Sequence, residues 1–391
     1  MRILIVNDTH YPQVNGASYF SQRLAHYLKI RGHKIAVIAP SESFKHTKKT
    51  IDDLPVYGIR SSQFLFKNDV KFRYCFPFFN KKYIQQILDE FKPDIVHIQS
   101  QFAVCRNTIN VSLKNKIKVV GTNHFMPENL IHYLPFGKKI TNYIKEILWN
   151  DFARVFNKLN DVTSPTETAA KLIRHRIKKP IKVISNGIDL KRFHPDEKNN
   201  PLNPLRKLFS IPNKPTFLYV GRLDREKYLD IVLKAIAKVR EQQDIHMVIA
   251  GNGIERDKLK DLTKKLKIED NVTFTGFVPD KDLPHLYNVA DCFVIAGTEE
   301  LQSLVTMEAM ASGLPVIGVN AMALPELVHD NKNGFQFEPG NIDELSTKML
   351  KFLADKALQK KMSDESLRII QHHDIEKTID QFEKIYTDQN I

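Results

Sequence analysis

The chain has 391 residues, of which 42% are apolar and 26% charged, a composition typical of a soluble globular protein with about two domains. Its three cysteines, Cys75, Cys105 and Cys292, lie far apart and show no metal-ligand spacing. We therefore expect a reduced, cytoplasmic setting rather than a disulfide framework. No run approaches the roughly 20 apolar residues that span a bilayer, so any membrane contact is expected to be peripheral.

Positive charge is concentrated in the first half of the chain. Residues 1–200 hold 33 Lys and Arg against 16 Asp and Glu, whereas residues 201–391 hold 25 against 29. The formal net charge of +13 therefore comes entirely from the first half. This asymmetry favours an anionic partner for that half, either nucleic acid or anionic lipid. A basic surface that serves only solubility is the alternative.

Short β-branched runs alternate with amphipathic stretches along the first half. The run Ile3–Val6 is typical of a buried strand, and Ser18–Arg31 places apolar residues on one helical face before Gly32 ends the helix. Further strands are expected at Lys34–Ala39, Ile95–Ile98 and Lys118–Val120. This alternation predicts βαβ units and a parallel sheet.

A proline-rich stretch, His194–Pro215, is expected to be a linker to a second pattern of the same kind. We predict an α/β protein with two doubly wound, Rossmann-like domains facing each other across a cleft, with ligands at the carboxyl ends of the strands. The predicted domains are residues 1–195 and 196–373, followed by a helical segment, residues 374–391. The second pattern has expected strands at 216–220, 245–250, 271–275, 292–296 and 315–319, and helices at 228–242 and 374–386.

Two loops that follow predicted strands contain features of phosphate-binding sites. Asn15 and Gly16 directly precede a predicted helix, where backbone amides can approach a phosphate. A plain tight turn is the alternative. In the second half, Arg222 and Lys227 lie five residues apart after a strand, and two such cations can clamp a diphosphate and stabilise its charge as it leaves. The alternative is a solvated, charged helix start.

Glycine turns follow two further strands of the second half. Gly251–Gly253 resembles a nucleotide-side loop, and the turn Gly276–Pro279, which contains Val278, exposes backbone that can hydrogen-bond a base edge. Each turn is equally consistent with an ordinary strand end, because short glycine patterns carry little information alone.

The segment Thr298–Gly318, TEELQSLVTMEAMASGLPVIG, is the most informative in the chain. Glu300 and Glu308 lie eight positions apart in an increasingly apolar run. Buried carboxylates need hydrogen-bonding partners, and the hydroxyls of a sugar or a ribose are suitable ones.

A helix is expected within this segment, capped by Ser303 and running to Ala311. The amides of Leu304 and Val305 would lie in its first turn. They can hold a phosphate there, with the helix dipole adding ~0.3–1 kcal/mol.

These motifs resemble those of the retaining family-4 glycosyltransferases of the GT-B fold over nearly the whole chain. The strongest is the E-x7-E pattern from Glu300 to Glu308, followed by EAMASGLPVIG. The supporting segments are PQVNGAS, PDIVHIQSQF, GTNHF, ISNGID, GRLDREK and GFVP.

The resemblance implies a role for each motif residue. Glu308 would bind the ribose hydroxyls of the nucleotide, and Glu300 the hydroxyls of the donor sugar. Arg222 and Lys227 would hold the diphosphate and stabilise it as the leaving group. The other implied donor contacts are the amides of Leu304 and Val305, the backbone near Val278, Asn15 with Gly16, and His124 facing the sugar across the cleft.

The resemblance also implies a function for each domain. The first domain would bind the acceptor, the second the nucleotide sugar, and the final helix would cross back to the first domain. The family characteristically needs neither a metal nor another cofactor, and no metal-binding Asp-x-Asp stands out here. Many members carry glycine where this chain has Ser303 and Asn15.

The expected function is retaining transfer of a hexose from a nucleotide-diphosphate sugar, with a UDP-sugar favoured, to an acceptor hydroxyl. Basic and aromatic residues interleave in Phe64–Tyr83 and Thr141–Phe156, which suits a bilayer interface. The chain resembles the diacylglycerol glucosyltransferases and lipid-linked mannosyltransferases of the family. We therefore expect a lipid acceptor, an anionic membrane surface and a peripheral position on the inner face of the cell membrane, with no nucleic-acid partner.

Several alternatives remain open from the sequence. The aromatic residues can belong to the core with a rim of solvated lysines. The acceptor can be soluble or a polysaccharide, and a GT-B phosphorylase or nucleotide-sugar epimerase shares the architecture. The E-x7-E pattern favours transfer over epimerisation, and the presence of Arg222, Lys227, Glu300 and Glu308 disfavours an inactive scaffold.

Overall fold

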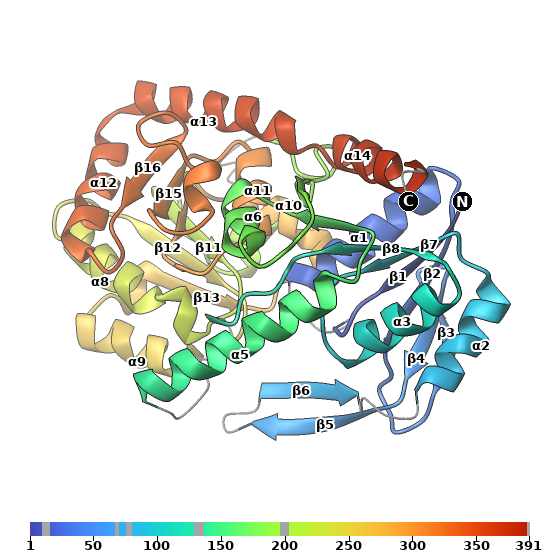
Figure 1. Ribbon diagram of the computed structural model, residues 1–391. Helices are drawn as coiled ribbons and strands as arrows, with labels where there is room; N and C mark the ends of the chain where they lie inside the picture. The colour runs from blue at the N-terminus through green and yellow to red at the C-terminus, as the bar shows by residue number, and fades with distance from the viewer. Residues whose placement is uncertain (10–15, 67–69, 76–79, 129–136, 196–202, 389–391) are drawn as a thin grey trace. The chain divides into compact units, whose positions relative to one another are not determined.

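A computed structural model describes the chain apart from residues 10–15, 67–69, 76–79, 129–136, 196–202 and 389–391 (Figure 1). The chain divides into two units: residues 1–186 with 376–391 form the first, and residues 187–375 form the second. Each unit is built on a parallel sheet whose strands alternate with helices along the chain. The predicted α/β class with two Rossmann-like domains is confirmed.

The sheet of the first unit has eight strands in the order β10-β9-β8-β7-β1-β2-β4-β3. Among the described residues its pairings are parallel except that of β3 with β4. The strand order reverses at β1, which lies between β7 and β2, and ligands of such sheets bind at this kind of switch point. The strands are β1 (Arg2–Val6), β2 (Lys34–Pro40), β3 (Thr47–Ile51), β4 (Leu54–Ile59), β7 (Ile95–Ile98), β8 (Lys118–Thr122), β9 (Asp161–Ser164) and β10 (Ile181–Val183).

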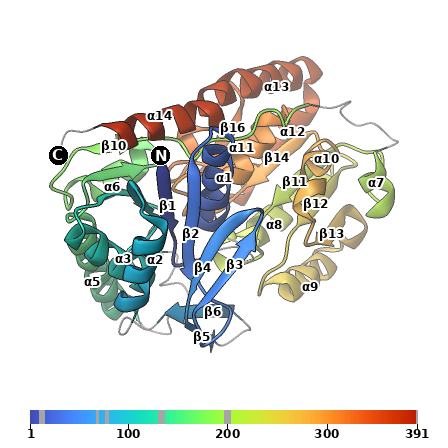
Figure 2. The same cartoon turned by 90° about the vertical axis from the view of Figure 1, so that its right-hand side faces the viewer.

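Complete burial explains why the β-branched runs form the centre of this sheet. All four residues of β7 are buried, as are four of β1 and five of β2, because a parallel strand is covered on both faces. An antiparallel ribbon, β5 (Ser61–Phe66) with β6 (Val70–Cys75), forms a separate small sheet that the sequence pattern did not predict (Figure 2). The helices before the chain leaves this unit are α1 (Gly16–Ile30), α2 (Lys81–Phe91), α3 (Ala103–Lys114), α5 (Lys138–Phe156) and α6 (Glu167–Arg174).

The last helix, α14 (Ile375–Thr387), packs on the first unit although it follows the second in sequence. Its Phe382 is fully buried and lies 6.0 Å from the ring of Phe20 on α1, measured between centroids. The hydroxyl of Tyr386 lies 2.7 Å from Nδ1 of His97 on β7. An apolar face and one buried hydrogen bond therefore join this helix to the sheet of the first unit.

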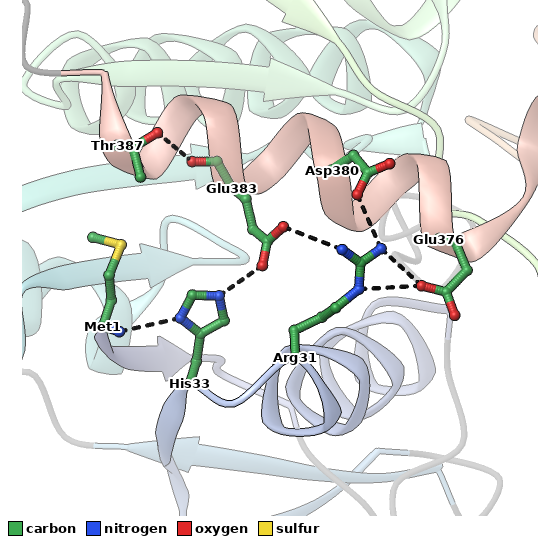
Figure 3. Close-up of polar contacts among 7 residues, drawn as sticks. All are labelled: Met1, Arg31, His33, Glu376, Asp380, Glu383 and Thr387. Atoms are coloured by element: carbon green, nitrogen blue, oxygen red, sulfur yellow. Dashed lines mark hydrogen bonds and ion pairs between the residues drawn. The ribbon is translucent and has the colours of Figure 1, made fainter.

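Ion pairs at the partly exposed edge of this packing also join α14 to Arg31 and His33 (Figure 3). The guanidinium of Arg31 lies 2.8 Å from Glu376, 2.9 Å from Asp380 and 3.6 Å from Glu383. Nε2 of His33 lies 2.7 Å from the carboxylate of Glu383. These carboxylates follow one face of α14 at helical spacing, so a single arginine contacts all three.

The sheet of the second unit has six strands in the order β13-β12-β11-β14-β15-β16. Every residue of β11, β12, β14 and β15 is buried, so helices cover both faces of its centre. The strands are β11 (Thr216–Val220), β12 (His246–Ala250), β13 (Val272–Gly276), β14 (Cys292–Ile295), β15 (Val316–Val319) and β16 (Gly334–Phe337). The α-helices are α7 (Pro204–Leu208), α8 (Leu229–Arg240), α9 (Arg256–Leu266), α10 (Leu283–Tyr287), α11 (Leu304–Ala311), α12 (Ile342–Ala354) and α13 (Lys356–Ile370).

The second unit begins before the proline-rich stretch rather than after it. Ile188 and Phe193 belong to its hydrophobic core, and the backbone of Ile188 exchanges hydrogen bonds with His373 and Ile375 where the chain returns. The described part of the proline-rich stretch packs here too, because Leu205 lies in the same core. Burial of these apolar side chains sets the boundary at residue 186, where composition alone pointed to residue 195.

Candidate active site

The loops at the carboxyl edge of the second sheet are held together by close backbone approaches. Gly251 follows β12 with φ of +132°, and a Cβ on it would lie 1.9 Å from the carbonyl oxygen of Gly221. Only glycine fits this position. The amide of Leu223 donates to the carbonyl of Asn252 at 3.0 Å, and the amide of Gly251 donates to that of Gly276 at 2.8 Å. The loops after β11, β12 and β13 therefore form one fixed edge.

Lys227 and Glu300 form a partly buried ion pair at this edge. Lys227 ends the short 3-10 helix η1 (Arg225–Lys227), and its Nζ lies 2.8 Å from Oε1 of Glu300, with each side chain 17% exposed. Burial alone would lower the pKa of Lys227, but the carboxylates of Glu300 and Glu226 outweigh it and raise that pKa. Lys227 is therefore charged at neutral pH. Gly297 leaves room for the pair, because a Cβ there would lie 3.3 Å from Cδ of Lys227.

Arg222 is held by two carboxylates that the sequence analysis did not assign. Its guanidinium contacts Asp224 and lies 2.8 Å from Glu226. These two acids are 6% and 2% exposed, whereas Arg222 is 43% exposed. The alternative of a solvated, charged helix start is therefore wrong for Asp224 and Glu226. Two buried acids thus hold the guanidinium in place, while 43% of the Arg222 side chain is exposed.

Helix α11 has the predicted bounds and cap. Ser303 precedes it, and its hydroxyl accepts a hydrogen bond from the amide of Thr306 at 3.3 Å. Leu304 and Val305 begin the helix, where backbone amides have no carbonyl partner within the helix. Glu308 lies one turn further along and is 7% exposed. The helix thus presents amide donors at its start and a buried carboxylate inside.

Glu308 has a partner that the sequence analysis missed. The hydroxyl of Tyr287, the last residue of α10, donates to Oε2 of Glu308 at 2.8 Å. Val278, which follows β13, is 5% exposed. Its side chain is therefore buried, and the contact of its backbone with a base stays a prediction.

Two predicted donor residues belong to the first unit and are described within it. His124 follows β8, and its Nε2 lies 3.0 Å from Oε1 of Gln99, while its ring packs 4.8 Å from Phe20 between centroids. Burial lowers the pKa of His124 to about 3, so the ring is neutral. Gly16 is the exposed first residue of α1. Asn15 lies outside the described residues.

Four of the predicted residues follow neighbouring strands of the second sheet: Arg222 and Lys227 come after β11, Glu300 after β14, and Glu308 lies in α11, the helix that β14 leads into. Of these four, Lys227 and Glu300 contact each other directly. The pairing of Arg222 with Asp224 and Glu226 could have been predicted from the sequence, because these acids alternate with basic residues in the RLDREK run. The pairing of Tyr287 with Glu308 could not, because the two residues are 21 positions apart. Within the described ranges, no group of three or more His, Cys, Asp and Glu side chains is placed to hold a metal ion.

The aromatic residues of α5 divide between core and surface. Trp149 and Phe152 are 5% and 0% exposed and belong to the core, so the membrane interpretation is wrong for them. Ile140, Tyr143 and Ile147 are 53%, 70% and 49% exposed and recur at helical spacing, forming what we call the α5 stripe. Most side chains of the other predicted stretch, residues 64–83, lie outside the described residues. No helix in the described ranges is long and apolar enough to cross a membrane.

Comparisons with known proteins identify the family and support the fold. The family profile "Glycosyltransferase Family 4" matches residues 14–192, and "Glycosyl transferases group 1" matches residues 205–368. Alpha-monoglucosyldiacylglycerol synthase of Streptococcus pneumoniae is 31% identical over 341 residues, covering 85% of this chain and 74% of the relative. N-acetyl-alpha-D-glucosaminyl L-malate synthase of Bacillus anthracis is 24% identical, covering 98% and 97%. The structure of Anabaena HepE in complex with UDP has a TM-score of 0.75 at 20% identity, covering 98% and 99%, and thus shares the fold.

Proposed function

This chain belongs to the glycosyltransferases of the GT-B type, and we propose that it moves a hexose from a UDP-sugar to a hydroxyl of a membrane lipid with retention of configuration. One observation carries the donor half of this proposal. Two cations, Arg222 and Lys227, follow strand β11, and two carboxylates, Glu300 and Glu308, lie after strand β14 of the same sheet, with Lys227 and Glu300 in direct contact. Cations of this kind can bind a diphosphate, and carboxylates can accept hydrogen bonds from the hydroxyls of a sugar and a ribose.

The donor would lie along this edge with its parts matched to separate groups. Glu308 binds the ribose, and Glu300 binds hydroxyls of the transferred sugar. Arg222 and Lys227 bind the diphosphate. The first-turn amides of Leu304 and Val305 add donors to the phosphates, the backbone near Val278 meets the base, and Asn15, Gly16 and His124 contribute from the first domain.

The ion pair between Lys227 and Glu300 is the state of the site before the donor binds. Without a donor, each group neutralises the other in a mostly buried place. When a diphosphate arrives, Lys227 exchanges its carboxylate partner for phosphate oxygens, and Glu300 accepts hydrogen bonds from sugar hydroxyls instead. Neither group is then left buried without a partner, which would cost several kcal/mol.

Transfer proceeds by loss of the nucleoside diphosphate and attack of the acceptor on the same face of the sugar. Negative charge grows on the leaving phosphate as the C1–O bond loosens, and Arg222 and Lys227 stabilise it. A phosphate oxygen of the leaving group takes the proton of the acceptor hydroxyl.

A lipid acceptor is supported by surface chemistry and by a relative. The α5 stripe exposes apolar side chains beside the exposed Lys139, and residues 1–200 carry an excess of 17 positive charges. Apolar residues with basic neighbours suit an anionic bilayer surface. The relative from Streptococcus pneumoniae is named for a glucosyldiacylglycerol product. We propose a diacylglycerol or glycolipid acceptor, with the enzyme peripheral on the cytoplasmic face of the cell membrane.

A soluble acceptor is the second candidate, because the relative from Bacillus anthracis is named for L-malate. The two candidates differ in where the product partitions. We would incubate the purified protein with radiolabelled UDP-glucose, UDP-galactose, UDP-N-acetylglucosamine and GDP-mannose, each with a lipid extract or with water-soluble acceptors. Label should enter the organic phase from one UDP-sugar.

Glu308→Gln provides the control for this assay, because it keeps the size of the side chain and removes its charge. It should abolish most of the transfer. Label in the aqueous product fraction alone would overturn the lipid acceptor and leave the donor half intact. Label from GDP-mannose alone would overturn the UDP assignment, and an interconverted free nucleotide sugar would indicate epimerisation instead.

A further inference from the structure

The carboxylate of Glu308 lies inside an apolar helix and receives a hydrogen bond from a second element. Helix α11 is apolar around Glu308, with Met307, Ala309 and Met310 all fully buried. An ionised carboxylate in such surroundings needs donors to remain charged. Tyr287 supplies one, since its hydroxyl lies 2.8 Å from Oε2 of Glu308.

The position of the Tyr287 hydroxyl is fixed by the packing of its ring. Tyr287 is fully buried at the end of α10. Its ring contacts Phe193 edge-on at 5.9 Å and Phe293 at 6.1 Å, measured between ring centroids. Such aromatic contacts constrain the side-chain torsions, so the position of the hydroxyl oxygen varies little.

The phenol donates its proton to the hydrogen bond with Glu308. Burial raises the pKa of Tyr287 well above its ordinary value, and the charge of Glu308 raises it further. The hydroxyl therefore stays protonated, and the carboxylate keeps a fixed partner at Oε2. A carboxylate held at one oxygen cannot turn freely about its last torsion angle, so the direction of its remaining lone pairs is defined.

We propose that Tyr287 is a positioning residue for nucleotide recognition, which orients the Glu308 carboxylate to accept hydrogen bonds from the ribose hydroxyls of the donor. This inference rests on the proposed function, because the ribose contact of Glu308 is part of it. The ligand class addressed is a ribonucleoside diphosphate, and the property that Tyr287 controls is discrimination against a deoxyribose at the same position.

Tyr287→Phe tests this role, because it removes only the hydroxyl and keeps the ring that Phe193 and Phe293 contact. We would measure the dissociation constants of UDP, 2′-deoxy-UDP and 3′-deoxy-UDP by calorimetry for the parent protein and the variant. The parent should bind UDP more tightly than at least one deoxy analogue by about 10-fold or more, as expected for a hydrogen bond to a charged group. In the variant, UDP binding should weaken by about 10-fold and the preference over the deoxy analogue should largely disappear.

Tyr386→Phe is the matched control. Tyr386 is also a buried tyrosine with one hydrogen bond to a polar side chain, 2.7 Å from His97, but it lies in the first unit. Both variants should lower stability to a similar degree, and only Tyr287→Phe should change the ratio of the UDP and deoxy-UDP dissociation constants. A merely structural role of Tyr287 would leave that ratio unchanged in both.

The possible results separate the inference from the function on which it rests. If the parent prefers UDP over the deoxy analogues and Tyr287→Phe keeps the same preference, the positioning role is overturned and the proposed function stands. If the parent binds UDP without any such preference, the ribose contact of Glu308 and the positioning role of Tyr287 are both overturned, whereas the transfer reaction is tested independently by the labelled-sugar assay. Steady-state kinetics give a second readout: the variant should raise the KM for the donor more than it lowers kcat, since ribose contacts persist from ground state to transition state.

Discussion

At the scale of single residues, the charge of Lys227 is the property on which transfer should depend most. The structure holds this charge in a mostly buried place, and its raised pKa keeps it protonated at neutral and mildly alkaline pH. Lys227→Ala removes one charged contact to the leaving diphosphate, which should lower kcat by about 100- to 1,000-fold, or ~2.7–4 kcal/mol. Steady-state kinetics with the donor identified by the acceptor assay measure this effect.

Arg225→Ala is the control for that substitution. Arg225 lies on the same 3-10 helix and is equally basic, but it is 60% exposed and pairs with Glu255. Its removal should leave kcat within about two-fold of the parent, because exposed ion pairs contribute little. A kcat for Lys227→Ala within a few-fold of the parent would contradict the leaving-group role.

At the scale of elements, two kinds of interaction attach α14 to the first unit, and their magnitudes differ. The pairs around Arg31 are partly exposed, with 33% of that side chain accessible, so Arg31→Met should cost about 1 kcal/mol or less and lose its effect at high salt. Phe382 is fully buried, and Phe382→Ala should cost ~3–5 kcal/mol. Hydrogen exchange of the α14 amides measures the loss of stability in each variant, because exchange reports local opening of the helix. A larger effect of Arg31→Met than of Phe382→Ala would show that charge, not packing, holds the helix.

The elements also show how far sequence reasoning reaches. Runs such as Ile3–Val6 and Ile95–Ile98 predicted their strands because burial on both faces demands continuous apolar residues. The β5–β6 ribbon escaped prediction, because it is paired locally and lies outside the alternating pattern. In the candidate site, Glu300 and Glu308 could be singled out from their spacing, and their roles stay predictions. Tyr287 could not, because a hydrogen bond between two separate helices produces no periodic pattern in the sequence.

At the scale of the whole molecule, the uneven charge should determine where the protein binds. Residues 1–200 carry an excess of 17 positive charges, and the remainder carries an excess of four negative ones. Each basic residue near an anionic surface contributes about 1 kcal/mol. Sedimentation with vesicles should therefore recover more protein with phosphatidylglycerol than with phosphatidylcholine alone. Equal recovery with both would contradict electrostatic docking.

The α5 stripe should contribute a component of this binding that salt does not remove. Raising the ionic strength from about 0.1 M to 1 M shortens the screening length from ~10 Å to ~3 Å, whereas burial of apolar side chains is not weakened by salt. Joint replacement of Ile140, Tyr143 and Ile147 by serine should therefore lower the recovery that persists at 1 M salt. Leu208→Ser, at a 69% exposed position of the second unit, should not change it. Unchanged recovery after the triple replacement would assign the membrane contact to another part of the basic half, because the exposed stripe would then bury no surface in the bilayer.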